Sequence, residues 1–206
     1  MSGIPCEHRK ELMKFLLIKT APVRSGVKPA EFLRVRKCYR SKPEEGFCIH
    51  QAEILATLRL PCRFLRKDAE SSLLLFYQPD LLQETLRNPV IREELVRIGY
   101  PREPSASAAL AFLRKRFTEE NLPHEIGFFL GYPPKDVLGY LRKEKRTPVP
   151  HGIWQVFGDP AESLRRMKLY SSVESLAEKI LETYQDIGVC LEKIASEINM
   201  KEVSYV

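Results

Sequence analysis

The residues with the clearest chemical potential lie in one short stretch, HEIGFFLGYPPKDVLGYL, at positions 124–141. The stretch opens with the ionisable pair His124 and Glu125, and it also carries Tyr132 and Asp136. A histidine at a helix N-terminus favours the neutral imidazole, because the positive end of the helix dipole opposes a second positive charge. These four side chains form our candidate ligand-binding site, in which His124 would hold a metal ion, a haem iron or an anion.

Each of these four side chains also has a purely structural interpretation. A histidine in the first turn of a helix can hydrogen-bond a neighbouring backbone group or Asp136, and lone histidines seldom act without partners. Tyr132 is suited to stapling a turn, and Asp136 to satisfying the free N–H groups that open a helix. The sequence leaves both interpretations open, and it identifies neither a cofactor nor a metal.

Five residues in this stretch predict that it folds as a helix-turn-helix. Gly131 ends a first helix where a left-handed residue is usual, Pro133 lies in the turn, and Val137 faces inward from a second helix. Gly127 and Gly139 are the small residues of the motif. The spacing from Gly127 to Gly131 to Val137 is also that of DNA-binding helix-turn-helix proteins.

Recognition of DNA by this helix pair is nevertheless not favoured. DNA readers send polar side chains of the second helix to base edges, whereas here only Lys135 could donate a hydrogen bond. The net charge of +6 is uneven, since residues 1–67 carry 15 Lys and Arg against 6 Asp and Glu. A weak nucleic-acid contact through this basic N-terminal third stays open, although a solvated basic surface explains the charge as well.

The sequence lacks the motifs of the common enzyme, metal and membrane classes. It contains no nucleophile elbow, P-loop, GxGxxG turn or HExxH motif, which leaves enzymatic activity unsupported rather than excluded. Its five cysteines include no C-x-x-C pair. Its apolar runs are too short to cross a bilayer, and its N-terminus does not resemble a secretion signal. We therefore expect a cytoplasmic location.

The elements that must position the candidate site predict an α+β fold. About four strands should form a small, mostly antiparallel sheet covered by helices. We expect these strands around Phe32–Lys37, in a hairpin of CRFLRK and SSLLLFYQ, and in GIWQVFGD, where Trp154 would lie in the sheet core.

Helices are predicted from the apolar spacing and from their end residues. A first helix from Glu7 should stop at Ala21 and Pro22, and Pro43 should open a second. Pro79 and Pro89 should each open a short helix, because proline suits the first helical position.

A long C-terminal helix is expected to extend a single α+β domain. The domain spans residues 1–172, and residues 173–206 form the amphipathic extension. Apolar residues from Leu176 to Ile198 recur by threes and fours, which predicts one continuous helix with one apolar stripe. The stripe would pack on the domain or pair with another chain, so a protein partner or self-association through this helix is a candidate interaction.

The stretch at positions 124–141 also carries a family resemblance. It is similar to the motif HEIGxFLGYPxxDVxGF of an uncharacterised bacterial family, domain of unknown function 3793. Segments such as APVRSGVKPAEF and GIWQVFGD extend the resemblance over roughly residues 10–170. The resemblance implies no activity, because the family itself is uncharacterised.

Three functional hypotheses follow from the sequence. The first is a non-enzymatic protein that binds a partner or a small ligand through the helix-turn-helix and the adjoining sheet surface. The second is a metal- or haem-handling protein in which His124 is a ligand. The third is a weak nucleic-acid binder that uses the basic N-terminal third.

Overall fold

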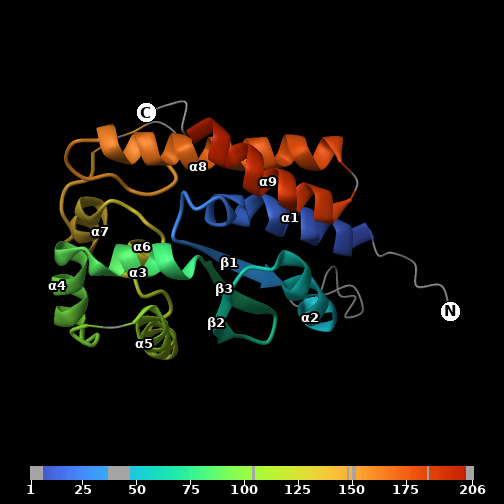
Figure 1. The fold of residues 1–206 in the computed structure, drawn as a ribbon. Coiled ribbons are helices and arrows are strands. Elements are labelled where there is room, and N and C mark those ends of the chain that lie inside the picture. The colour runs from blue at the N-terminus through green and yellow to red at the C-terminus, as the bar shows by residue number, and fades with distance from the viewer. Residues whose placement is uncertain are drawn as a thin grey trace.

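The computed structural model describes residues 7–36, 47–103, 105–147, 149, 152–184 and 186–202 of the 206-residue chain. Within these ranges the chain forms nine helices and three strands, arranged as in Figure 1. In chain order they are α1 (Glu7–Arg24), β1 (Ala30–Arg36), α2 (Phe47–Leu58), β2 (Cys62–Lys67), β3 (Ser71–Tyr77), α3 (Pro79–Arg87), α4 (Pro89–Ile98), α5 (Ala106–Glu119), α6 (Ile126–Phe129), α7 (Pro134–Leu141), α8 (Ala161–Thr183) and α9 (Ile187–Glu202). The predicted α+β class is confirmed, with helices dominating.

The sheet is antiparallel and has the order β1-β3-β2. Leu74 of the central strand β3 pairs with Leu33 of β1 on one side and with Phe64 of β2 on the other. Six of the seven residues of β3 are buried. Burial on both faces explains why this strand is a continuous apolar run without alternation. The predicted hairpin and the predicted first strand are both confirmed.

The sheet separates two hydrophobic cores, because successive side chains of a strand point to opposite faces. Leu74 and Phe76 face a core shared with α1, α2, α8 and α9. Leu73 and Leu75 face a second core shared with α3, α4, α5, α6 and α7. In Figure 1 the helices α1, α8 and α9 form a layer along the top of the view, while α3 to α7 gather at the left. The stretch at positions 124–141 therefore belongs to the second core.

The predicted fourth strand, GIWQVFGD, is wrong for the described part of the chain. Its residues 152–159 form an irregular loop, held by one isolated antiparallel bridge between Thr147 and Val156. Trp154 lies outside the sheet and packs on the ring of Tyr132, and Phe157 packs on α7. The apolar residues of this segment thus pack a loop on a helix. Alternation of apolar residues in the sequence cannot distinguish such a loop from a paired strand.

The C-terminal apolar stripe is divided between two helices. A long helix is present as predicted, but α8 already begins at Ala161 and ends at Thr183, and a separate helix, α9, begins at Ile187. Asp186 Oδ1 accepts a hydrogen bond from Val189 N at 2.9 Å, which caps the new helix. Helix α8 packs along α1 and α9, and Ile180, Leu191 and Ile194 lie in the first core. From Leu176 to Ile194 the stripe packs against the chain itself, and self-association through it stays a prediction.

The proposed boundary at residue 172 lies inside α8. Val173 and Ala177 beyond it share the first core with Leu16 of α1. The division into a domain of residues 1–172 and an extension of residues 173–206 is not tested by these contacts and stays a prediction.

The ends of the first two helices differ in how far the prediction holds. Helix α1 continues through Pro22 to Arg24, two to three residues past its predicted stop, with Pro22 inside its last turn. The predicted start of the second helix at Pro43, and the predicted end of the first strand at Lys37, lie outside the described residues. None of the helices within the described ranges is long and apolar enough to cross a membrane.

Candidate functional site

The stretch at positions 124–141 forms α6 and α7, joined by a tight turn. Gly131 in this turn has φ 74°, a left-handed conformation that favours glycine. A Cβ at this position would lie 2.6 Å from Pro29 Cδ. The Gly131 carbonyl accepts hydrogen bonds from Arg166 Nη1 at 2.7 Å and from the Tyr170 hydroxyl at 3.3 Å, both on α8. The similarity of this helix pair to DNA readers stays a sequence-based prediction.

The other two glycines of the motif permit close packing. A Cβ at Gly127 would lie 2.9 Å from Val137 Cγ2, so Gly127 lets α6 and α7 approach each other. A Cβ at Gly139 would lie 2.4 Å from Phe157 Cγ, so Gly139 receives the aromatic ring of the 152–159 loop. Pro133 is buried and precedes the first residue of α7. Gly127, Gly139 and Pro133 therefore serve the architecture.

Asp136 is a buried carboxylate, 2% exposed, at the centre of a hydrogen-bond network. Its Oδ1 accepts from Lys135 Nζ at 2.7 Å and from Phe157 N at 2.9 Å. Its Oδ2 accepts from Trp154 Nε1 at 2.8 Å and from Ser163 Oγ at 2.6 Å. Burial by itself raises the pKa of Asp136, but these four donors outweigh it and lower the pKa below its ordinary value.

This network joins three parts of the chain that are distant in sequence. The donors lie on α7, on the 152–159 loop and on α8, while the sequence suggested that Asp136 would satisfy the N–H groups of its own helix. Helix α7 has no side-chain cap in the structure. Asp136 therefore ties the irregular loop to the helices on both sides of it.

Glu125 is a second buried carboxylate, 1% exposed. It accepts hydrogen bonds from Arg116 Nε at 2.9 Å and from the Tyr100 hydroxyl at 3.3 Å. Burial, and then the charge of Glu125, raise the pKa of Tyr100, so this phenol stays a hydrogen-bond donor. Because Arg116 lies on α5, Glu125 anchors α5 to the start of α6.

Tyr132 belongs to a group of aromatic rings around a buried lysine. Its ring stacks on Trp154 with centroids 4.2 Å apart and an interplanar angle of 17°. The Lys28 ammonium lies 4.9 Å from the Tyr170 ring centroid and 5.9 Å from that of Tyr132. It also forms an ion pair with Glu31 at 2.6 Å. This group fixes the turn between α6 and α7 against α8 and the start of β1.

His124 is exposed, and its ring contacts the Tyr140 ring with centroids 4.6 Å apart. Neither Glu125 nor Asp136 receives a hydrogen bond from it among the contacts of the described residues. The four predicted site residues lie in three places: Tyr132 and Asp136 both contact Trp154, Glu125 contacts Arg116 and Tyr100, and His124 contacts Tyr140. Throughout the described ranges, no group of three or more His, Cys, Asp or Glu side chains is placed to hold a metal ion.

A different set of side chains, which we call the basic groove, lines a hollow between β2 and α5. The hollow has a volume of about 330 Å³ and is open to solvent. Its lining residues are Arg63, Ala111, Arg114, Lys115 and Thr118. The last four recur at intervals of three, one and three along the exposed face of α5, so they form one wall of the groove, and Arg63 forms the other.

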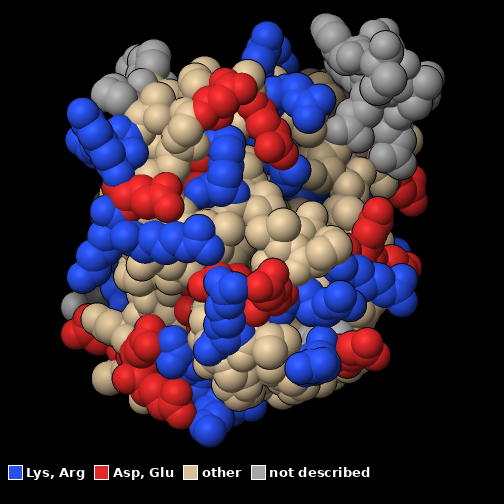
Figure 2. Space-filling view, turned by 90° about the vertical axis from the view of Figure 1, so that its left-hand side faces the viewer, with Lys and Arg blue, Asp and Glu red and all other residues tan. Residues whose placement is uncertain are grey.

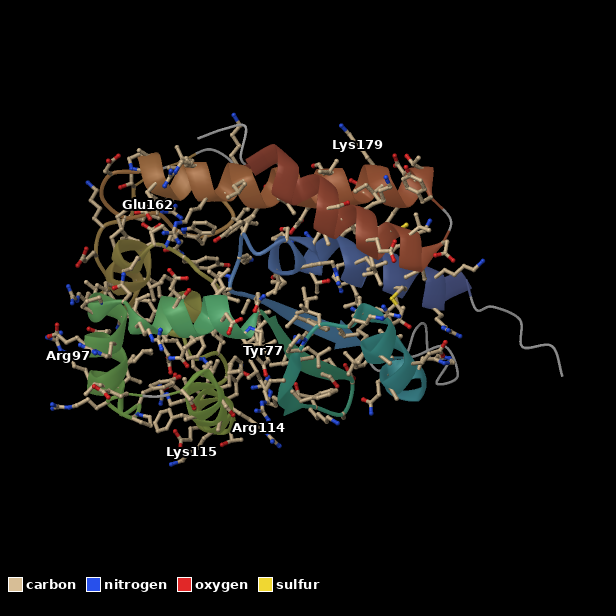
Figure 3. The ribbon with its side chains drawn as sticks, viewed as in Figure 1. Tyr77, Arg97, Arg114, Lys115, Glu162 and Lys179 are labelled. Atoms are coloured by element: carbon tan, nitrogen blue, oxygen red, sulfur yellow. The ribbon has the colours of Figure 1, made fainter. Side chains whose placement is uncertain are left out.

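The cations of the basic groove are only partly compensated by acids. Lys115 Nζ lies 3.7 Å from Glu119 Oε1. Arg63 and Arg114 form no ion pair with any acid in the described part of the chain, and Arg63 Nε is buried without an acceptor. Figure 3 shows Arg114 and Lys115 projecting outward from α5. The groove therefore holds two free guanidinium groups and one shared ammonium group.

Two contacts fix the walls of the basic groove relative to each other. Arg66 of β2 donates through Nη1 to the carbonyl oxygen of Asn121 at 3.1 Å and to its side-chain Oδ1 at 3.2 Å. The Arg116–Glu125 ion pair holds the same end of α5 to α6. The motif at positions 124–141 thus helps to position the groove without lining it.

Sequence reasoning did not find the basic groove, because its walls are far apart along the chain. The cations of α5 by themselves resemble any solvated helix surface. Arg63 joins them only because α5 packs on β2. The excess of basic residues in the N-terminal third includes Arg63, and this excess was the only sequence feature that pointed to the groove.

The surface at the α4 and α7 end of the molecule has no single sign of charge. Figure 2 shows Lys and Arg side chains interspersed with Asp and Glu across this face. A continuous basic field, which nucleic-acid binding requires, is not present on the face in view. This face therefore gives the helix pair no electrostatic support as a DNA reader.

Comparison with known proteins places the chain in a family. It belongs to DUF3793, described as a protein of unknown function, whose family model matches residues 16–190. The match confirms the resemblance drawn from the motif, and it continues past residue 172 into α9. Neither the curated proteins nor the solved structures gave a match.

Proposed function

We propose that this protein binds a small anionic ligand in the basic groove and does so without catalysing a reaction on it. The observation that carries the proposal is the pair of uncompensated guanidinium groups, Arg63 and Arg114, on opposite walls of one hollow. Two such guanidinium groups repel each other unless an anion lies between them. Charge-assisted hydrogen bonds from arginine to an oxyanion are among the stronger hydrogen bonds in proteins.

The contrast with two other helical arginines supports this proposal over a merely solvated basic face. Arg97 on α4 pairs with Glu93 at 2.6 Å and with Glu94 at 3.3 Å. Arg116, two residues from Arg114 on the same helix, pairs with Glu120 at 2.6 Å. Arg97 and Arg116 thus each have acids three or four residues away, whereas the corresponding positions around Arg114 hold Leu110, Ala111, Phe117 and Thr118.

The two other hypotheses stay predictions with less support. A metal or haem iron bound at His124 would need further ligands, whereas the ring contact of His124 is with Tyr140. A nucleic-acid contact through the N-terminal third would also use Arg63 of the basic groove. A binding experiment therefore has to distinguish nucleic-acid binding from binding of a small anion.

The proposal is tested by the thermal stability of the protein in the presence of sulfate. A ligand that binds only the folded state stabilises it by about 2.7 kcal/mol at 100 times its dissociation constant. For a chain of this length, that corresponds to a rise in Tm of about 5–11 °C. Sulfate at constant ionic strength should raise the Tm of the native protein.

Two variants and a control locate the effect. Arg63→Gln and Arg114→Gln should each remove most of the rise in Tm. Arg97→Gln removes the same charge from α4, away from the groove, and should keep it (Figure 3). An equal rise in all three variants would mean that sulfate acts elsewhere or through general salt effects, and would refute the proposal.

A further inference from the structure

We infer that the ligand of the basic groove is a small molecule with a terminal phosphate, bound as the dianion. This inference rests on the proposed function, since it names the class of ligand that the same groove takes. It follows from the number of cationic groups, from their arrangement on two walls and from the side chains that complete the lining.

The charge of the groove matches a dianion. Arg63 and Arg114 are uncompensated, and Lys115 shares its charge with Glu119 at 3.7 Å. The groove therefore offers more than two positive charges to a ligand. A phosphomonoester carries about −1.5 to −2 at neutral pH, whereas a phosphodiester or a carboxylate carries a single charge.

The arrangement of the cations matches three oxygens that point in different directions. Arg63 approaches from β2, and Arg114 and Lys115 approach from successive positions of α5. A terminal phosphate presents three acceptor oxygens, so each cation can bind one, and a guanidinium fork can bind two. A carboxylate has only two oxygens in one plane, and a phosphodiester has only two that are not bridging.

The rest of the lining indicates what the phosphate is attached to. Ala111 and Thr118 are short side chains that leave the hollow open beside the cations. None of the five lining residues is aromatic, so the groove has no platform on which a nucleobase could stack. The terminal phosphate therefore belongs to a small polar phosphomonoester, not to a stretch of nucleic acid.

Isothermal titration calorimetry on the full chain tests the ligand class. Methyl phosphate should bind at least tenfold more tightly than dimethyl phosphate, which has the same tetrahedral centre but one charge and two free oxygens. The affinity for methyl phosphate should rise about tenfold between pH 5 and pH 7, as its second proton with a pKa near 6 is lost. Arginine does not titrate in this range, so the affinity for sulfate should stay constant and serves as the control.

Variants separate the groove from the rest of the surface. Arg114→Gln and Arg63→Gln should each lower the affinity for methyl phosphate at least tenfold. Arg114→Lys should lower this affinity less, because lysine keeps the positive charge although it lacks the guanidinium fork. Arg97→Gln should bind like the native protein. Circular dichroism melts of the same samples establish that each variant is folded.

The outcomes distinguish this inference from the proposed function. Binding of dimethyl phosphate as tight as that of methyl phosphate, or an affinity for methyl phosphate that does not change with pH, would overturn the phosphate dianion and leave anion binding in place. Absence of sulfate and phosphate binding alike would overturn both. A single-stranded oligonucleotide that binds more tightly than methyl phosphate, with a steep loss in salt, would replace the small ligand with nucleic acid. Vesicles containing phosphatidic acid that bind through Arg63 and Arg114 would support the terminal phosphate and assign it to a lipid headgroup.

Discussion

Replacing Asp136 with asparagine tests whether the buried carboxylate organises the loop of residues 152–159. Asparagine keeps the shape of the side chain and one acceptor oxygen, but it replaces the second oxygen with an amide donor. If the oxygen stays toward Phe157 N, the new N–H₂ group faces the indole N–H of Trp154, and two donors then oppose each other. Ser163 can rotate its hydroxyl to accept, whereas Trp154 Nε1 cannot.

The expected loss of stability combines two effects. A buried donor that loses its acceptor costs about 1–3 kcal/mol, and the charge-assisted part of the remaining hydrogen bonds to Asp136 adds a further contribution of similar size. Lys135 keeps its hydrogen bonds to the Phe157 carbonyl at 2.8 Å and to Ser163 Oγ at 2.9 Å, which limits the loss. We expect the free energy of unfolding to fall by about 3 kcal/mol, which lowers the Tm by roughly 6–12 °C in a chain of this size.

Fluorescence provides a local measurement, because Trp154 is the only tryptophan in the chain. Loss of its hydrogen bond and of its stacking on Tyr132 should shift the emission to longer wavelength in the folded state. Asp159→Asn is the matched control: Asp159 is exposed, its Oδ1 accepts from Ala161 N at 3.0 Å, and asparagine fulfils that role equally well.

The contribution of Asp136 should also depend on pH in a defined direction. Its folded-state pKa is lowered below the ordinary value of 3.8, so the carboxylate stabilises the fold above that value. This stability is lost as the pH falls through the lower folded-state pKa. The difference in unfolding free energy between the native protein and Asp136→Asn should therefore be constant from pH 8 to pH 5 and shrink below pH 4. A Tm and an emission maximum for Asp136→Asn equal to those of Asp159→Asn would refute the role of this network.

The remaining predictions concern the packing of the motif. Gly139→Ala should lower the free energy of unfolding by about 1–3 kcal/mol in a chemical denaturation experiment, because its Cβ would lie 2.4 Å from the ring of Phe157. Gly188→Ala, in the first turn of α9, would place its Cβ 3.0 Å from the capping oxygen Asp186 Oδ1, a single side-chain atom that can shift, and should cost less than about 1 kcal/mol; an equal loss in both variants would contradict the packing argument. His124→Ala should cost less than about 1 kcal/mol, because its ring makes one exposed contact with Tyr140 and caps no helix. A larger loss, measured in the same experiment, would mean that His124 has a structural role beyond that contact.

Local features of the fold followed directly from the sequence. Pro79 and Pro89 open α3 and α4 as predicted, and Gly99 ends α4 with φ 107°. The hairpin of β2 and β3 and the strand β1 were also predicted. These elements are determined by neighbouring residues: proline fixes φ at a helix start, glycine permits a left-handed end, and an apolar run predicts a buried strand.

For the candidate site, the motif, its glycines and its family could be read from the amino-acid sequence. Gly127, Gly131 and Gly139 could be recognised as constrained positions, because few side chains fit such places. The side chains that contact these glycines could not be predicted, because Pro29, Val137 and Phe157 reach them only through tertiary packing. Likewise, the sequence showed an acidic side chain at Asp136 but not the four donors around it.

The pairing of charged groups, by contrast, depends on the folded chain. The tertiary structure buried Glu125 and Asp136 in networks that support α5 and the 152–159 loop, and it left His124 at the surface. It also brought Arg63 of β2 beside Arg114 of α5. The physical reason is that the free energy of a charge depends on its burial and on neighbours from any part of the chain, so electrostatic roles are fixed only once the fold is complete.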